Sequence, residues 1–330
     1  MNQPLVSVII PAYNCAGVLS GTIDSVLKQT YGNLEIVVVD DGSSDGTGIV
    51  AEGYLESGKV RCFRQENGGP GAARNRGMQS ARGEYLAFLD SDDSLMCDSV
   101  EKRMALLEEA GDVELLYSNY IVRHSDTSVT TRFDESYPGK YRSLCREYPH
   151  GVVFEGSPSE LFEIPFDFWT GTVIVSRNLV ERVGLFRTDI SIGEDRDMWI
   201  RMAMSAGRIG YIRSTVACYN RSKGGLTGRD PVRYATARRD LNLYFLEKYG
   251  RSSQKRNVRK VINDSLSWIY FDLGRHYREG GMKGRAIGNF LKSIYFSPKN
   301  SLPYKEIVST VLPRVLLDRI KNASKEVSSA

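Results

Sequence analysis

The chain has 330 residues, of which 41% are hydrophobic and 25% are charged, and its net charge is +4. This composition is ordinary for a soluble globular protein and excludes disordered and fibrous classes, and the length suits one large domain with an appendage. The net charge hides an asymmetry, because residues 231–330 carry 20 Lys and Arg against 8 Asp and Glu, while the remainder carries 24 against 32. A basic tail on an acidic body indicates an anionic partner, such as a membrane surface or nucleic acid.

Alternating strands and helices are predicted over the first 90 residues. The expected strands are residues 6–10, 34–39, 60–64 and 85–89, and the expected helices are 16–30, 47–55 and 72–81. Residues 68–71, Gly-Gly-Pro-Gly, are expected to form a loop before the third helix. This alternation predicts an α/β fold with a doubly wound, mostly parallel sheet.

The rest of the chain continues this unit and then becomes helical. Further strands are expected at 115–122 and 172–175, an irregular stretch at 125–165, and helices at 177–183, 195–206, 231–250, 255–279 and 283–296. We therefore expect a domain at 1–230, with halves 1–120 and 121–230, and a basic helical region at 231–330.

Cysteine usage and hydropathy bear on the compartment. The five cysteines are scattered without a CxxC pair, and the three histidines are far apart. This pattern favours reduced thiols in the cytoplasm over a disulfide scaffold or a zinc site. The polar N-terminus does not resemble a signal peptide, and no apolar run reaches the roughly 18 residues of a membrane-spanning helix.

Three acidic clusters are the most informative feature. Asp40-Asp41 ends the second strand, residues 90–93 (Asp-Ser-Asp-Asp) follow the fourth, and Glu194-Asp195 opens a later helix. Ligands of open α/β sheets bind beside the carboxyl ends of the strands. Carboxylates gathered at one cleft repel one another unless a cation, a base role or a polyhydroxyl ligand accounts for them.

Six sequence blocks occur in an ordered set. They are residues 8–14 (VIIPAYN), 29–31 (QTY), 38–47 (VVDDGSSDGT), 67–77 (NGGPGAARNRG), 88–93 (FLDSDD) and 193–199 (GEDRDMW). Together they resemble glycosyltransferase family 2, nucleotide-sugar-dependent enzymes of the GT-A fold. The resemblance covers roughly residues 5–230.

The resemblance implies a site for the nucleotide. It places Pro11 and Tyr13 after the first strand, with the Tyr13 ring against the base, and makes Asp41 an acceptor from base or ribose. It places Arg74 near the nucleotide or its phosphates, where a guanidinium suits phosphate oxygens. The alternative for Asp40 and Asp41 is turn capping, and the neighbouring Arg76 is expected to be an exposed charge on its helix.

Asp90-Ser91-Asp92 matches the family's DxD motif. A departing nucleoside diphosphate needs its negative charge stabilised, and a divalent cation held by one or two carboxylates does so. The resemblance implies that Asp92 binds the metal directly and that Asp90 lies nearer the ribose or the metal's waters. Oxygen ligands favour Mg²⁺ or Mn²⁺, and Asp93 is expected in a supporting or helix-capping role.

Glu194-Asp195 resembles the family's ED motif. There the Asp is the general base that takes the proton of the acceptor hydroxyl, so the resemblance implies Asp195 as base and Glu194 as its orienting partner or an acceptor contact. The alternative is stabilisation of a helix N-terminus. Trp169 and Trp199 are candidates for the acceptor site, with core packing as the alternative.

A later segment departs from the family pattern. Lys223 stands where many members have His, and processive members' Gln-x-x-Arg-Trp block is absent. Arg221 and Lys223 are therefore candidates for contacting the diphosphate, with a solvated loop as the alternative.

The resemblance implies an inverting, non-processive glycosyltransferase. We expect transfer of one sugar from a nucleotide diphosphate-sugar, UDP favoured, to a hydroxyl of a glycan or lipid-linked glycan. The rival hypotheses are a sugar nucleotidyltransferase, for which the loop after the first strand lacks a basic residue, and a non-catalytic glycan-binding protein.

The charge of the basic tail also suggests where in the cell the protein acts. We expect a cytoplasmic protein without a nucleic-acid partner, with possible peripheral contact to an anionic membrane face. The helices expected at 231–250 and 255–279 carry pairs of basic residues and are proposed to bind the membrane. The apolar residues beside these pairs are Leu241, Tyr244, Phe245, Trp268 and Ile269. The alternative is that these apolar faces pack on the catalytic domain while the charges face water.

Overall fold

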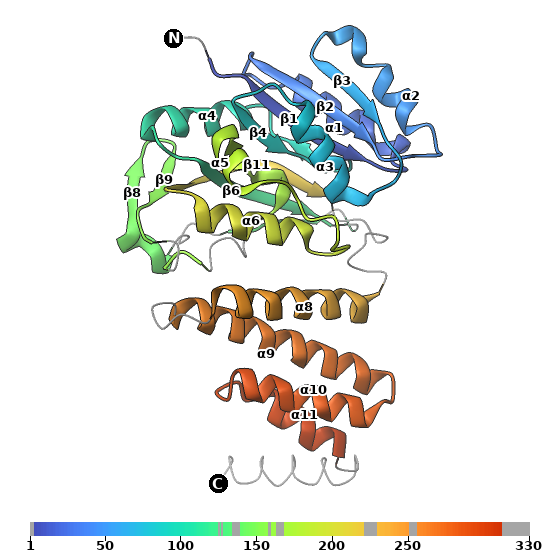
Figure 1. The fold of residues 1–330 in the computed structure, drawn as a ribbon, viewed down its shortest axis with the longest axis vertical. Helices are drawn as coiled ribbons and strands as arrows, with labels where there is room; N and C mark the ends of the chain where they lie inside the picture. The colour runs from blue at the N-terminus through green and yellow to red at the C-terminus, as the bar shows by residue number, and fades with distance from the viewer. Residues whose placement is uncertain are drawn as a thin grey trace. The chain divides into compact units, whose positions relative to one another are not determined.

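The structure is a computed structural model (Figure 1). It describes residues 3–124, 126, 128–133, 139–157, 160–162, 168–220, 230–250 and 256–311. The chain divides into two compact units, Met1–Lys223 and Gly224–Ala330. The first is α/β and the second is helical, and the division lies near the boundary expected at residue 230.

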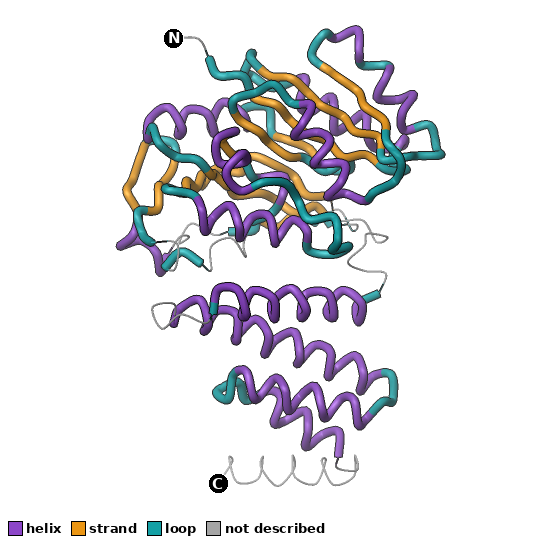
Figure 2. Tube along the Cα trace, in the orientation of Figure 1, coloured by secondary structure: helices purple, strands orange, loops and turns teal. Residues whose placement is uncertain are grey.

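One mixed sheet forms the centre of the first unit, with helices packed against it (Figure 2). Its strands are β1 (Val6–Ala12), β2 (Leu34–Asp40), β3 (Val60–Arg64), β4 (Tyr85–Phe88), β5 (Ser94–Leu95), β6 (Leu115–Arg123), β7 (Val129–Thr131), β8 (Cys145–Tyr148), β9 (Gly151–Phe154), β10 (Ile174–Ser176) and β11 (Ile209–Asn220). The order is β3-β2-β1-β4-β10-β6-β11-β9-β8, with β5 paired to β11 and β7 paired to β6. The α/β fold expected from the sequence is confirmed.

The parallel part of the sheet positions the acidic clusters. Strands β3, β2, β1 and β4 run parallel, and every residue of β2 is buried. Continuous apolar strands of this kind are covered on both faces, here in part by the crossover helices α1 (Ala16–Leu27), α2 (Thr47–Glu52) and α3 (Gly69–Ser80). Because the strands share a direction, their carboxyl ends lie along one edge.

The other half of the sheet is mixed and was only partly predicted. Strand β10 runs antiparallel to both β4 and β6, and β8 and β9 form an antiparallel pair within the stretch expected to be irregular. Strand β11 was missed altogether. Its pairing with β6 shifts register twice between Ile212 and Ala217, so a regular alternation of buried and exposed residues is interrupted there.

Helix α3 begins at Gly69 rather than at residue 72. Pro70 lies in its first turn, where the missing N–H is not needed by the helix. Gly69 has φ +83°, a conformation that favours glycine. The Gly-Gly-Pro-Gly run therefore starts the helix, and the expectation of a separate loop was wrong.

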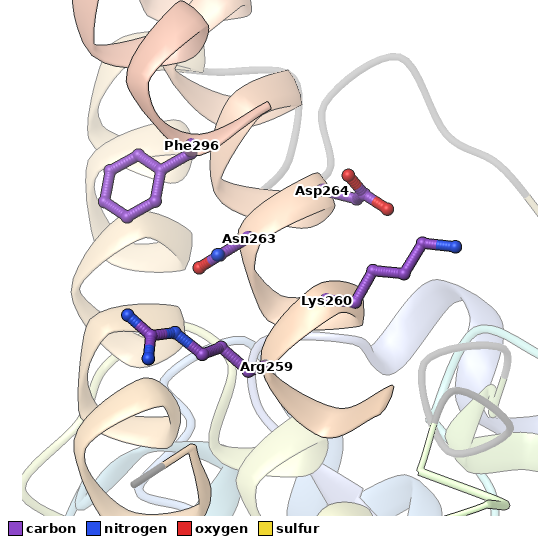
Figure 3. Close-up of a pocket in the computed structure, with 5 residues that line it drawn as sticks. All are labelled: Arg259, Lys260, Asn263, Asp264 and Phe296. Atoms are coloured by element: carbon purple, nitrogen blue, oxygen red, sulfur yellow. The ribbon is translucent and has the colours of Figure 1, made fainter. Parts of the chain in front are cut away.

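Four helices form the described part of the second unit. They are α8 (Pro231–Tyr249), α9 (Arg256–Glu279), α10 (Lys283–Phe296) and α11 (Leu302–Val311), each packed against the next in chain order (Figure 1). A cavity on α9 and α10 is lined by Arg259, Lys260, Asn263, Asp264 and Phe296 (Figure 3). No described helix is both long and apolar enough to cross a bilayer.

The expected membrane-binding side chains are mostly interior. Leu241, Phe245 and Ile269 are buried, whereas Trp268 is 52% exposed. Helix α8 packs against α9, and burial of these three residues makes them unavailable to a membrane. The prediction that these three residues face a membrane was wrong.

Candidate functional site at the carboxyl ends of β1, β2 and β4

The loops after β1 and β2 are joined by polar contacts. The backbone N–H of Asn14 donates to Ser43 Oγ (3.0 Å), and Asn14 Oδ1 accepts from the N–H of Ser44 (2.9 Å). Asn14 has φ +47°, the one positive value at a described non-glycine residue. These contacts fix the segment that follows Pro11, a half-buried residue of β1. Tyr13 lies in this segment and is 53% exposed. An exposed ring in a fixed loop is suited to stacking.

Asp40 is a structural residue of this edge. Its carboxylate is fully buried, accepts from the N–H of Ser43 (2.9 Å) and pairs with Arg64 (2.9 Å). Asp40 therefore caps the turn after β2, which was the alternative given for it above.

Asp41 holds the start of helix α3. One carboxylate oxygen accepts from Gln65 Nε2 (2.8 Å) and from the N–H of Gly68 (2.9 Å), and the other accepts from the N–H of Gly69 (2.8 Å). A hydrogen bond from a base or ribose would be the fourth that the Asp41 carboxylate accepts. The carboxylate therefore connects the expected nucleotide loop to the helix that carries Arg74.

Arg74 joins the second and third acidic clusters. Its guanidinium pairs with Asp90 (2.8 Å) and with Glu194 (2.9 Å), 120 residues further along the chain. It also lies over the Phe186 ring, 5.5 Å from the centroid. Burial alone would lower the pKa of Arg74, but the charges of Asp90, Glu194 and Asp195 raise that pKa above its ordinary value. Arg74 Nε has no hydrogen-bond partner among the described residues, so the guanidinium keeps donor capacity beyond these two pairs.

Close packing fixes α3 against the start of α6 (Glu194–Ser205). Asn75 exchanges two hydrogen bonds with the backbone of Phe186, at 2.8 and 2.9 Å. A Cβ on Gly71 would lie 3.3 Å from Glu194 Cγ, which is tight, so glycine permits this approach. The prediction that Arg76 is an exposed charge on the same helix is confirmed.

The first turn of α6 presents two carboxylates in different surroundings. Glu194 is 8% exposed, and burial raises its pKa although the Arg74 charge opposes that shift. Asp195 is half-buried, and it accepts from Thr170 Oγ1 (3.5 Å) and from the N–H of Arg196 (2.7 Å). Glu194 thus contacts Arg74, while Asp195 keeps acceptor capacity at the protein surface.

The turn after β4 carries the DxD residues. Thr22 Oγ1, on α1, lies 2.8 Å from the carbonyls of Ser91 and of Asp93, and so holds the turn. Asp92 reaches solvent, yet partial desolvation by the protein and the negative charge of Asp90 raise its pKa.

These residues fit a divalent cation shared with a substrate. The charge of Asp90 helps to raise the pKa of Asp92, and a bound cation would lower that pKa again. The part of the chain that the structure describes contains no group of three or more His, Cys, Asp or Glu side chains placed to hold a metal by themselves. Asp92 and Asp90 would therefore supply one or two oxygens, and a diphosphate would supply others, as Mg²⁺ and Mn²⁺ accept.

Asp93 is buried beside the turn rather than capping a helix. It is 1% exposed and precedes strand β5, so the helix-cap expectation was wrong. One oxygen accepts from the N–H of Asn220 at the end of β11 (2.8 Å), and the other has no hydrogen-bond partner among the described residues. Burial, with the charge of Asp90, raises the pKa of Asp93 to about 9.

We expect Asp93→Asn to stabilise the metal-free protein at high pH. A carboxyl whose folded-state pKa exceeds its unfolded-state value loses stability as pH rises between the two values, because ionisation is penalised only in the folded state. Asn imitates the neutral acid, so wild type and variant should have similar melting temperatures near pH 4, and the variant should melt higher at pH 8. Thermal unfolding in a chelating buffer measures this; a difference that does not change with pH would contradict it.

The two tryptophans differ in position. Trp199 is 1% exposed and packs edge-on against Phe88 and Phe186, so it belongs to the core and offers no ring face to an acceptor. Trp169 is half-buried between Tyr120 and Tyr219 and remains a candidate. Arg221 and Lys223 lie outside the described residues.

Three contacts at this site were not predicted from the sequence. They involve Thr170 beside Asp195, Asn220 beside Asp93 and Phe186 beneath Arg74. The segments concerned are a 3-10 turn (Thr170–Thr172), the end of β11 and the loop before α6. None carries a motif, although the β-branched residues of β11 were a usable signal for the strand.

Comparison with known proteins agrees with this geometry. Residues 7–165 match the family model described as Glycosyl transferase family 2. The chain belongs to glycosyltransferase family 2. An uncharacterized glycosyltransferase from Rickettsia felis is 34% identical to it over 248 residues, which make up 74% of this chain and 38% of that protein. The chain thus spans well under half the length of that relative.

Solved structures resemble this family 2 glycosyltransferase in fold. TarS from S. aureus (residues 1–349, in complex with UDP-GlcNAc) superposes with TM-score 0.61 at 18% identity, covering 92% of this chain and 88% of that one. The mannosyltransferase PcManGT from Pyrobaculum calidifontis, in complex with GDP-Man and Mn²⁺, gives TM-score 0.57 at 18% identity, covering 94% and 86%. This likeness shows the GT-A fold.

Proposed function

We propose that this family 2 glycosyltransferase transfers one sugar, with inversion, from a nucleotide diphosphate-sugar to a hydroxyl of a glycan or lipid-linked glycan. The observation that carries the proposal is the Arg74 bridge, at 2.8 and 2.9 Å, between Asp90 of the DxD turn and Glu194 of the ED pair. It brings the donor-side acids and the base-side acids to one place, as a reaction between two substrates requires.

The donor half of the proposal rests on the edge formed by β1, β2 and β4. Tyr13 supplies an exposed ring for the base, and Asp41, which is buried and already accepts three hydrogen bonds, is proposed to accept one more from the base or ribose. UDP is the favoured nucleotide, and the UDP-GlcNAc complex of TarS supports this choice. PcManGT binds GDP-Man instead, so binding of both UDP and GDP should be measured. The positively charged side chains of Arg221 and Lys223 are proposed to contact the diphosphate.

A divalent cation, Mn²⁺ or Mg²⁺, would be held by Asp92 and Asp90 together with the donor. When bound it would supply positive charge to the departing diphosphate. The PcManGT complex contains Mn²⁺, which supports this choice. In the chain itself, Thr22 holds the turn that presents both carboxylates.

Asp195 is proposed as the general base. The acceptor hydroxyl attacks the anomeric carbon, a new C–O bond forms as the bond to the diphosphate breaks on the opposite side, and Asp195 takes the hydroxyl proton. Thr170 and the N–H of Arg196 orient the carboxylate. Glu194, neutralised by Arg74, positions the first turn of α6, and Trp169 is the proposed acceptor contact.

We expect Asp92→Asn to abolish metal-dependent binding of a nucleoside diphosphate while the fold is kept. The amide removes the negative oxygen that a hard cation prefers. Isothermal titration of UDP and GDP, with and without Mn²⁺, measures this. Screening a panel of nucleotide sugars for metal-dependent hydrolysis then identifies the donor.

Asp98→Asn is the matched control. Asp98 lies a few residues further along, where it pairs with Lys102 at 2.7 Å on α4 (Ser99–Ala110). Its loss should leave nucleotide binding unchanged. Unaltered, metal-dependent affinity in Asp92→Asn would remove Asp92 from the metal site.

A further inference from the structure

One segment of the second unit is uniformly basic. From Gly280 to Lys305 the sequence contains five basic residues and no acidic residue. All five are exposed, and none forms an ion pair with a described carboxylate; they are Lys283, Arg285, Lys292, Lys299 and Lys305. Positive charge on this segment is therefore available to an external partner.

Apolar side chains are exposed on the same segment. Leu291 is 55% exposed and Tyr295 is 78% exposed, and both share a face of α10 with Lys292, since residues three and four apart lie together on a helix. On α11, Tyr304, Val308 and Val311 are 46%, 48% and 61% exposed at the same kind of spacing.

The turn between the helices joins these two faces. The Tyr304 hydroxyl donates to the carbonyl of Pro298 (3.3 Å), which places its ring beside the residue preceding Lys299. Helices α10 and α11 also pack against each other (Figure 1). We call Leu291, Lys292, Tyr295, Lys299, Tyr304 and Lys305 the α10–α11 surface.

The exposed side of α9 has a different composition. Trp268 is 52% exposed there, but Asp264 and Asp272, four residues to either side, are also exposed. Lys260 and Asp264 extend from the same side of α9 in Figure 3. An exposed aromatic ring on this face thus lies among charges of both signs, which provides an internal control.

We propose that the α10–α11 surface binds the face of an anionic phospholipid bilayer. Basic residues are attracted to anionic headgroups, and exposed Tyr and Leu side chains can enter the headgroup region. A nucleic acid would use the same charges, but exposed aliphatic residues such as Leu291 and Val308 contribute nothing to phosphate contact. The apolar component therefore favours lipid.

Sedimentation of the full chain with vesicles tests this surface. We expect binding to equimolar phosphatidylcholine and phosphatidylserine, weakened by salt, and none to phosphatidylcholine alone. Neutralising three lysines together (Lys292→Gln, Lys299→Gln, Lys305→Gln) should weaken binding by about 100-fold, since each basic residue near such a membrane contributes about fivefold. Leu291→Ser with Tyr295→Ser should also weaken it, but with less dependence on salt.

The control is Trp268→Ser, which should leave vesicle binding unchanged. Vesicle binding requires neither donor nor metal, so its outcome is independent of the proposed catalytic function. Circular dichroism and retained UDP binding, where wild type binds UDP, show that each variant is folded. Equal binding to neutral vesicles, unaltered binding by the lysine variant, or binding of duplex DNA or RNA without binding of vesicles would overturn the proposal.

Discussion

Asp195→Asn should lower kcat by roughly 10²–10⁴-fold, the usual contribution of a general base, and leave donor affinity nearly unchanged. The amide keeps the shape of the side chain and its contacts with Thr170 and the N–H of Arg196 but cannot accept the hydroxyl proton. Steady-state transfer assays measure kcat, and calorimetry measures donor binding.

Asp189→Asn is the control for this measurement. Asp189 lies on the loop before α6 and pairs with Arg187 at 2.5 Å, with 65% of its side chain exposed. Its replacement removes one carboxylate from the same region without touching the proposed base. A variant of Asp195 that lost donor affinity but kept kcat would make Asp195 a binding residue.

Arg74→Met should destabilise the protein by roughly 3 kcal/mol and reduce turnover. Removing one member of a buried ion pair leaves uncompensated charge and typically costs roughly 3–5 kcal/mol; the lower value is expected because Asp90 is about a third exposed. The Arg74 charge also lowers the pKa of Glu194, so without it that carboxyl should ionise at higher pH. The stability deficit should therefore shrink as pH falls and Glu194 becomes protonated.

Two further variants define the role of Arg74. Arg76→Met changes an exposed arginine on the same helix and should alter stability by no more than about 0.5 kcal/mol. Arg74→Lys keeps one charge but cannot span two carboxylates, so it should recover part of the stability and little of kcat. Denaturant unfolding and transfer assays measure both, and a fully active Arg74→Met protein would contradict a positioning role.

The sequence predicted the local features of this fold better than its long-range contacts. Strands β1, β2 and β4 were recognisable because they are largely apolar runs, and β2 and β4 lead directly into acidic clusters. The partners of Arg74 were not predictable, because Glu194 reaches it only through the arrangement of α3 and α6. A helical pattern likewise located α8 and α9, but hydrophobicity alone did not distinguish buried Phe245 from exposed Trp268.

The ends of the central sheet bear on how the protein behaves at high concentration. Its two outermost strands, β3 and β8, both carry charged side chains: Arg61 and Arg64 on the first, Arg146 and Glu147 on the second. A second copy that added a strand at either end would have to desolvate these groups, and Arg61, Arg64 and Glu147 are already held in ion pairs. Such charges oppose the growth of the sheet from one molecule to the next and so protect the folded chain from strand-mediated aggregation.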